Sequence, residues 1–126
     1  MEQLGHFING ITVPNSSSRS GQVYNPALGK AIRTVGFAET TDAQAAIAAA
    51  KAAFPAWQAT SLARRTQMMF SFREILNSRR SELAAITTEE HGKTLPDAIG
   101  EVTRGLEVVE CATGLAHLLK GNYSES

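Results

Sequence analysis

Residues 41–57, TDAQAAIAAAKAAFPAW, mark the point at which the chain changes from β-prone to helical sequence. Thr41 followed by Gln44 forms a capping box, in which each side chain satisfies a backbone N–H that the first helical turn leaves without a partner. Alanine is the best helix former, so Ala43–Phe54 is predicted to be helical and Pro55 to interrupt that helix. The stretch divides the chain into an extended part before about residue 40 and a helical part after it.

The part before this stretch is predicted to form a hairpin and further strands. Residues 6–13, HFINGITV, place Asn9-Gly10 between two short β-prone runs, and Asn-Gly supplies the positive φ angles of a type I′ turn. A polar loop, a short extended run, a turn and a second strand are then expected at residues 14–21, 22–24, 25–29 and 30–38.

Three more helices are predicted after Pro55. They cover residues 61–79, 81–91 and 97–119, with Ser61 and Asp97 as N-terminal caps and with Gly92 and Gly121 as terminating residues. Residues 81–91 are expected to form either a separate helix or a continuation of the preceding one after a kink. The expected fold class is therefore α+β, with a β-hairpin and strands over residues 1–40 followed by about four helices over residues 41–120.

Composition restricts the class of protein. Of the 126 residues 43% are hydrophobic, and twelve basic residues balance twelve acidic ones. A nucleic-acid surface or an anionic membrane surface usually requires a basic excess, so neither partner is expected. The single cysteine, Cys111, excludes an intrachain disulfide, and the first residues lack the features of a signal or transit peptide. A cytoplasmic protein is the resulting expectation.

Several residues resemble parts of chemical motifs without their context. Gly92-Lys93-Thr94 resembles the end of a phosphate-binding loop, but that motif needs a glycine at the position of Thr87 and a preceding strand. His6, His91 and His117 lie on different predicted elements, so no metal site is expected. Cys111 falls within a helix with no local base, and is interpreted as a small buried hydrophobe rather than a nucleophile.

The helix predicted over residues 97–119 holds the most informative charge. Its apolar residues form one broad arc, comprising Val102, Leu106, Val108, Val109, Cys111, Ala112, Leu115, Ala116, Leu118 and Leu119. Arg104 and Glu101 fall inside this arc. Spacing alone favours an ion pair between them, or an arginine that extends to solvent. The alternative is that Arg104 enters a cavity and binds a ligand carboxylate through two parallel hydrogen bonds.

Several strings along the chain resemble the aldehyde dehydrogenase superfamily. Residues 6–10, HFING, precede residues 23–29, VYNPALG, and residues 45–57, AAIAAAKAAFPAW, resemble that superfamily's first long helix. The match continues through Arg64 or Arg65, Leu83-Ala84 and residues 90–94, EHGKT, while Leu28 departs from the threonine that is common there. Residues 90–98 and 100–110, EHGKTLPDA and GEVTRGLEVVE, resemble the methylmalonate-semialdehyde dehydrogenases in particular.

The resemblance implies both a reaction and a place within a larger subunit. Family members oxidise malonate or methylmalonate semialdehyde to acetyl-CoA or propionyl-CoA through a cysteine thioester, with NAD accepting the hydride and coenzyme A accepting the acyl group. The chain then corresponds to an N-terminal segment that lacks the rest of the cofactor domain, the catalytic domain and the oligomerisation arm. Arg104 matches an arginine associated with the substrate carboxylate. No catalytic, cofactor-binding or metal-binding residue is expected in these 126 residues.

Further expectations follow from that placement. The segment alone should be inactive, should bind neither NAD nor coenzyme A, and should be marginally stable or associate, whereas the full enzyme is expected to form dimers or tetramers. Two alternatives remain. One is a segment of a non-acylating enzyme, such as one for succinate semialdehyde, and the other is a non-catalytic helical assembly module. A metabolic role in valine catabolism is expected if the chain belongs to a CoA-acylating methylmalonate-semialdehyde dehydrogenase.

Overall fold

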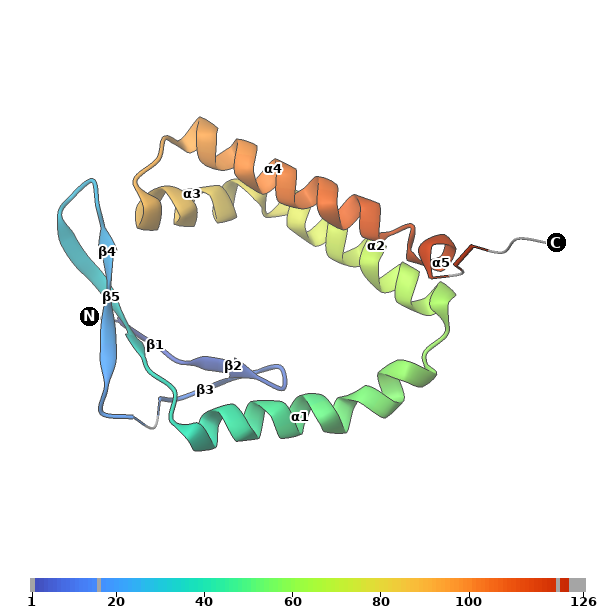
Figure 1. Cartoon of the computed structure of the whole chain (residues 1–126). Coiled ribbons are helices and arrows are strands. Elements are labelled where there is room, and N and C mark those ends of the chain that lie inside the picture. The colour runs from blue at the N-terminus through green and yellow to red at the C-terminus, as the bar shows by residue number, and fades with distance from the viewer. Residues whose placement is uncertain (1, 16, 120, 123–126) are drawn as a thin grey trace. The chain divides into compact units, whose positions relative to one another are not determined.

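A computed structural model describes residues 2–15, 17–119 and 121–122, and the chain divides into two compact units. The first unit comprises Met1–Ala59 with Glu89–Gly92, and the second comprises Thr60–Thr88 with Lys93–Ser126. Figure 1 labels the elements, whose order is five strands followed by five helices. None of the helices formed by the described residues is long and apolar enough to cross a bilayer. The α+β fold class predicted from the sequence is confirmed.

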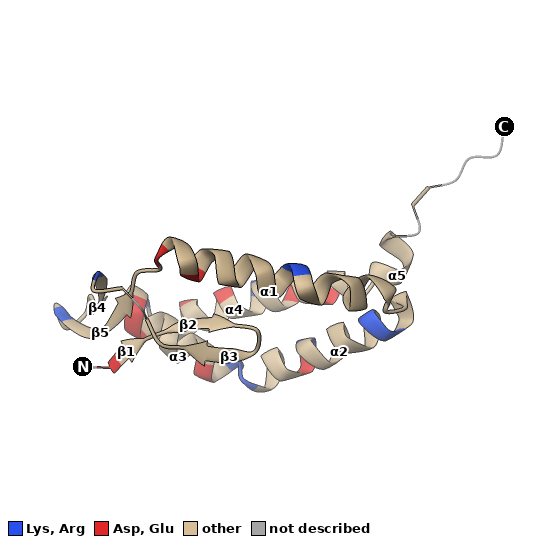
Figure 2. Ribbon diagram, turned by 90° about the horizontal axis from the view of Figure 1, so that it is seen from below, with Lys and Arg blue, Asp and Glu red and all other residues tan. Residues whose placement is uncertain are grey.

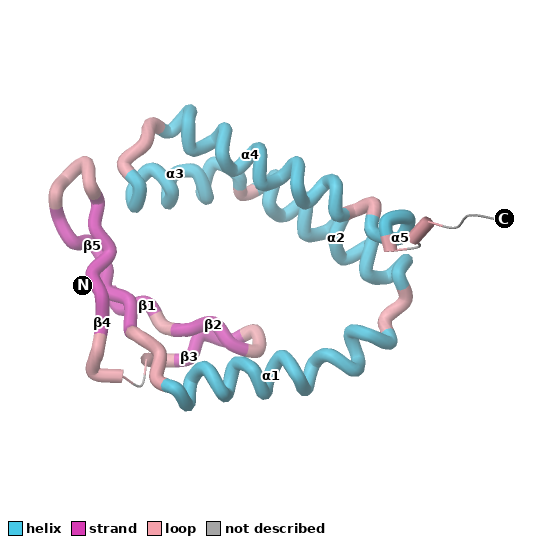
Figure 3. The backbone as a smooth tube through the Cα atoms, viewed as in Figure 1, coloured by secondary structure: helices cyan, strands magenta, loops and turns pink. Residues whose placement is uncertain are grey.

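The first unit contains a three-stranded sheet with the order β1-β5-β4. Strand β5 (Lys30–Gly36) lies between β1 (Glu2–Leu4), to which it is parallel, and β4 (Ser20–Asn25), to which it is antiparallel. Figure 3 draws these strands in magenta. The turn between β4 and β5 forms as predicted, because the Leu28 N–H donates to the Asn25 carbonyl at 3.2 Å and Gly29 has a φ of 62°. Strand β1 was not predicted, because three residues without an alternating pattern give no signal of their own.

The predicted hairpin forms at residues 6–13. Strands β2 (His6–Ile8) and β3 (Ile11–Val13) pair in antiparallel fashion with Ile8 opposite Ile11. Asn9 and Gly10 have φ angles of 52° and 80°, the double positive φ that a type I′ turn requires. Figure 2 shows this hairpin beside helix α1 (Thr40–Ala59). Phe7, Ile8 and Asn9 line a groove of about 240 Å³ together with Ala46, Ala49, Ala50 and Ala53.

Helix α1 differs from its prediction at both ends. It begins at Thr40, and the carboxylate of Asp42 accepts the backbone N–H of Glu39 at 2.8 Å, so the predicted capping box at Thr41 and Gln44 is wrong. Pro55 lies inside the helix, which runs to Ala59, so the predicted interruption is also wrong. Proline removes one backbone donor, and the alanine-rich turns around it retain enough helix propensity to continue.

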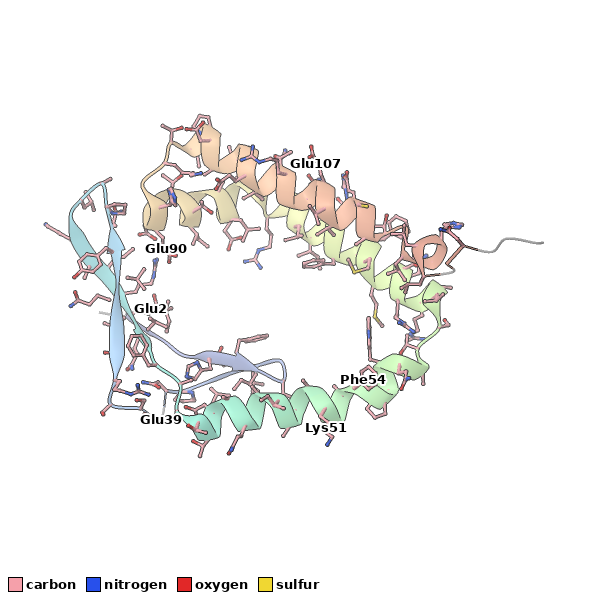
Figure 4. The ribbon with its side chains drawn as sticks, viewed as in Figure 1. Glu2, Glu39, Lys51, Phe54, Glu90 and Glu107 are labelled. Atoms are coloured by element: carbon pink, nitrogen blue, oxygen red, sulfur yellow. The ribbon has the colours of Figure 1, made fainter. Side chains whose placement is uncertain are left out.

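A polar cluster fixes the loop that precedes α1. The Ser17 hydroxyl donates to Glu39 Oε1 at 2.5 Å, and Arg19 Nη2 lies 3.4 Å from the same oxygen. Glu39, labelled in Figure 4 at the start of α1, therefore has a pKa below its ordinary value, first because of the Ser17 hydrogen bond and then because of the Arg19 charge. Together with Asp42, this carboxylate lies where the helix dipole favours negative charge.

Arg33 connects three segments of the first unit. From β5 its guanidinium contacts Glu89 at 2.8 Å, Glu2 at 3.3 Å and Glu90 at 3.4 Å. Glu2 belongs to β1, whereas Glu89 and Glu90 belong to the end of helix α3 (Arg80–His91). The Arg33 side chain is 25% exposed, and its hydrogen bond to Glu89 raises its pKa above the usual arginine value. The cluster joins the edge and central strands to a helix end that is remote in sequence.

The second unit is helical. Helix α2 (Leu62–Ser78) begins as predicted, with the Ser61 hydroxyl accepting the Arg64 N–H at 3.3 Å. The predicted stop of α3 is also confirmed, since Gly92 has a φ of 82°.

Helix α4 (Leu95–Ala112) begins earlier and ends sooner than predicted. Thr94 is its N-cap, because its hydroxyl accepts the Asp97 N–H, so the assignment of Asp97 as the cap is wrong. A break at Thr113-Gly114 separates α4 from a short α5 (Leu115–Leu118), where one continuous helix was predicted. Gly121 has the positive φ expected of a terminating glycine, at 74°. Lys120, at the end of the predicted helical part, lies outside the described residues.

Few apolar side chains are buried among the described residues. The buried ones are Ala84, Ala98 and Leu106, whereas large apolar residues on every long helix are exposed. On α1, for example, Ile47 is 68% exposed and Phe54 is 56% exposed. Exposed apolar area of this kind favours association. The expectation that the isolated chain is marginally stable or self-associates remains a prediction, and these exposures support it.

Two glycines with positive φ provide a matched test of the first unit. At Gly92 an added Cβ would lie 2.7 Å from Pro26 Cγ, whereas at Gly29, with a φ of 62°, nothing lies within 4 Å. Gly29→Ala should lower the free energy of unfolding by about 1–2 kcal/mol through backbone strain alone. Gly92→Ala should cost roughly 1 kcal/mol more, because the methyl group also displaces Pro26. Urea titration followed by circular dichroism measures both, and equal costs would contradict the contact with Pro26.

The lowered pKa of Glu39 predicts a pH dependence of stability. A carboxyl group whose pKa is lower in the folded state stabilises the fold at pH values above its ordinary pKa of 4.5, and this contribution is lost as the pH falls through the folded-state pKa. Glu39→Gln should therefore lower the urea midpoint at neutral pH, and the difference from the parent chain should shrink as the pH falls through the lowered pKa of Glu39. Ser17→Ala should show a weaker change of the same sign. A midpoint difference that does not vary with pH would refute the assignment.

Candidate functional site

Contact with α2 determines which side of α4 is covered. The two helices lie side by side in the second unit. Arg73 on α2 donates from Nε and Nη2 to Glu110 Oε1 on α4, at 2.9 and 2.6 Å, and this hydrogen bond raises the pKa of Arg73 above its ordinary value. Leu106 is 6% exposed, and Val102 and Val109 are half-buried on the same side of α4. The predicted apolar arc is therefore only partly covered.

Another part of that arc is exposed. Residues Glu101, Arg104, Gly105, Val108 and Cys111 occupy one side of α4 and are all exposed; this surface is called the Arg104 face below. Val108 is 70% exposed and the Arg104 side chain is 69% exposed. The arginine lies beside the exposed aliphatic side chain of Val108 and presents an accessible cation on this face.

The guanidinium of Arg104 lies back along the helix. Its Nη2 is 3.9 Å from Glu101 Oε1, and its Nη1 is 3.8 Å from the position that a Cβ on Gly100 would occupy. The separation from Glu101 exceeds hydrogen-bonding distance, so the pair is a loose i,i+3 contact. The ion pair favoured by spacing is thus present in this chain. Binding of a ligand carboxylate by Arg104 remains a prediction.

A second cation contacts the same carboxylate. Lys93 Nζ forms an ion pair with Glu101 Oε1, and the Lys93 side chain is only 19% exposed. The sequence pattern alone did not indicate this contact. Lys93 lies eight residues before Glu101 and outside α4, so helical periodicity carries no signal for the pair.

The Gly92-Lys93-Thr94 segment offers no free side-chain group to a nucleotide phosphate. Lys93 is engaged by Glu101, and the Thr94 hydroxyl donates to the Asp97 carboxylate at 2.8 Å. The two groups that would bind phosphate are thus both paired with carboxylates, which repel a phosphate. The described residues around this turn do not fit the pyrophosphate of a dinucleotide.

Cys111 and the three histidines lie apart from one another. Cys111 is exposed on the Arg104 face, so its interpretation as a buried residue is wrong for this chain. His6 lies on β2, His91 ends α3, and His117 lies on α5. Within the part of the chain that the structure describes, no group of three or more His, Cys, Asp or Glu residues is arranged to hold a metal ion.

The fold and the sequence together define the family. The model of the aldehyde dehydrogenase family matches residues 13–126, and the chain belongs to this family. A structure from Sinorhizobium meliloti, described as a methylmalonate-semialdehyde dehydrogenase and solved with NAD, superposes on this chain with a TM-score of 0.94. That structure is 44% identical and covers 99% of this chain, while the chain covers 26% of it.

Two curated relatives have closely related names. A malonate-semialdehyde dehydrogenase of Pseudomonas aeruginosa is 44% identical over 126 residues, which are 100% of this chain and 25% of the relative. A Dictyostelium discoideum protein, described as a probable mitochondrial methylmalonate-semialdehyde/malonate-semialdehyde dehydrogenase of the acylating kind, is 41% identical over 95% of this chain and 23% of its own length. The chain thus spans about a quarter of the length of these relatives.

Glycine at position 105 permits a test of the Arg104 face. An added Cβ there would meet nothing within 4 Å. Glycine inside a helix is also less favourable than alanine. In the 126-residue chain, Gly105→Ala should raise the free energy of unfolding by about 0.5–1 kcal/mol. Gly100→Ala is the matched control, because its Cβ would make only an ordinary contact with Arg104 at 3.8 Å. A loss of stability for Gly105→Ala in urea titration would show that this face is covered.

Proposed function

We propose that this chain is the N-terminal part of an NAD-dependent, CoA-acylating dehydrogenase that oxidises malonate or methylmalonate semialdehyde to acetyl-CoA or propionyl-CoA. The observation that best supports the substrate class is the 44% identity with a malonate-semialdehyde dehydrogenase across the whole chain. The exposed cation of the Arg104 face adds chemical support, because these substrates carry a carboxylate beside the aldehyde.

Arg104 is proposed to bind the substrate carboxylate. In malonate semialdehyde one carbon separates the carboxylate from the aldehyde, so a cation held on a rigid helix fixes the position of the reacting carbonyl. A guanidinium suits this task better than an ammonium, since its planar fork donates two parallel hydrogen bonds to one carboxylate. The 3.9 Å separation from Glu101 leaves these donors without a close acceptor on that side.

The remaining chemistry is assigned to the rest of the full-length enzyme. NAD as hydride acceptor and coenzyme A as acyl acceptor are proposed for that enzyme, and the acylating description of the Dictyostelium discoideum relative supports the second. The Gly92-Lys93-Thr94 turn, whose lysine and threonine are both paired with carboxylates, does not fit the pyrophosphate of NAD. The segment alone is therefore proposed to be inactive, contributing one substrate contact and part of the scaffold.

Assembly and location are also proposed from the chain's surface. The full-length enzyme is proposed to be a homo-oligomer, a dimer or a tetramer, and the exposed apolar residues of α1 and α2 support burial in a larger assembly. A cytoplasmic location is supported by the free, exposed thiol of Cys111, which persists in a reducing compartment.

Changing Arg104 tests the substrate assignment in the full-length enzyme. Arg104→Ala should raise KM for methylmalonate semialdehyde by a factor of about 10 to 100, the loss expected for charge-assisted hydrogen bonds. KM for propionaldehyde, which has no carboxylate, should remain unchanged. Arg104→Lys is the matched variant, because it keeps the positive charge but loses the planar fork of the guanidinium. Its KM for methylmalonate semialdehyde should lie between those of the parent and of Arg104→Ala. Equal effects on both aldehydes in steady-state kinetics would leave Arg104 as a structural residue.

A non-acylating enzyme for a longer carboxylated aldehyde is the alternative. In succinate semialdehyde the carboxylate lies one carbon farther from the aldehyde, so a cation placed for malonate semialdehyde would hold it in the wrong position. The product distinguishes the two readings, since acylation yields a CoA thioester and hydrolysis yields a free acid.

A further inference from the structure

We infer that Lys93 is a positioning residue for carboxylated substrates, which acts by neutralising Glu101 and thereby keeps Arg104 available. This inference rests on the proposed role of Arg104 and extends it to two neighbours on the same unit. In the structure the ammonium of Lys93 and the guanidinium of Arg104 both contact a single oxygen, Glu101 Oε1.

The two cations differ in their accessibility to a substrate. The Lys93 side chain is 19% exposed, whereas that of Arg104 is 69% exposed. Lys93 is therefore the more enclosed of the two cations, and an incoming anion meets Arg104 first. The Lys93 contact to Glu101 is also much the closer one, since Arg104 Nη2 lies 3.9 Å from that oxygen.

The backbone holds Lys93 in place. Gly92, with a φ of 82°, ends α3 immediately before Lys93, and Thr94 caps α4 immediately after it. A residue between the end of one helix and the N-cap of the next has little backbone conformational freedom. Its ammonium is consequently directed at the first turns of α4, where Glu101 lies.

Charge balance then connects Lys93 to substrate binding. With Lys93 present, the three side chains carry one net positive charge, which attracts a carboxylate. Without Lys93, Glu101 and Arg104 cancel each other, and Glu101 also repels the carboxylate of the substrate. Glu101 would in addition draw Arg104 into a closer i,i+3 pair, which occupies the donors that the substrate needs.

Kinetics of the full-length enzyme test this arrangement. Lys93→Met should raise KM for methylmalonate semialdehyde about fivefold, the effect of losing roughly one ion-pair interaction, with little change in kcat. KM for propionaldehyde should not change. The double variant Lys93→Met with Glu101→Gln should return KM for methylmalonate semialdehyde close to the parent value, because the uncompensated charge is removed. Lys93→Arg should behave like the parent.

The outcomes separate this inference from the proposed function. If Lys93→Met impairs both aldehydes equally, or if Glu101→Gln fails to restore KM in the double variant, Lys93 has only a structural role and the inference is overturned. If Arg104→Ala changes KM equally for both aldehydes, the proposed contact between Arg104 and the substrate carboxylate is itself refuted. Circular dichroism and the thermal midpoint of each variant establish that it is folded, so a kinetic change in a folded variant reports on the site.

Discussion

The packing of α4 against α2 is the constraint on which the candidate site depends. Leu106 faces the contact and is 6% exposed, and Arg73 holds Glu110 across it at 2.6 Å. Full burial of a leucine side chain is worth about 1.5–3 kcal/mol, so this one contact fixes the rotation of α4 about its axis. Once that rotation is set, helical geometry directs Arg104 to the uncovered side, because residues two apart on a helix do not share a face.

The uncovered side of α4 is one example of a general feature, which is that few apolar side chains are buried among the described residues. Ala84, Ala98 and Leu106 are the buried apolar residues among those described, and two of the three are alanines. On α2, Met68, Phe72 and Ile75 line an open groove of about 510 Å³ on the side with Arg64 and Gln67. Marginal stability is normal even for well-buried domains, so a chain with these exposures depends on additional partners. The identity with relatives roughly four times as long agrees with that physical need.

Local signals predicted the elements well, because their causes are local. Asn9-Gly10 defines a type I′ turn, Ser61 caps α2 and Gly92 ends α3, each through the backbone of adjacent residues. The errors arise where two local signals compete. Asp42 accepts the Glu39 N–H and so sets the start of α1 ahead of Thr41.

Other features depend on residues remote in sequence, and these could not be predicted. The parallel pairing of β1 with β5 is one. The Lys93 contact to Glu101 spans only eight residues, but it joins a turn to a helix and so leaves no periodic signal. For the site, the helical pattern identified Arg104 and Glu101 as neighbours. It could not reveal which part of the apolar arc α2 covers, because that depends on the partner helix. Exposure of Cys111 was missed for the same reason.

The Arg33 cluster has a consequence for synthesis of the protein on the ribosome. The β1-β5-β4 sheet needs nothing beyond Gly36, so it can close early in the nascent chain, with Arg33 paired to Glu2. Its partners Glu89 and Glu90 follow 56 and 57 residues later. At translation rates of about 5–20 residues per second, roughly 3 to 11 seconds separate these events. During that interval Arg33 has only Glu2 as a carboxylate partner. The end of α3 then docks onto strands that are already paired.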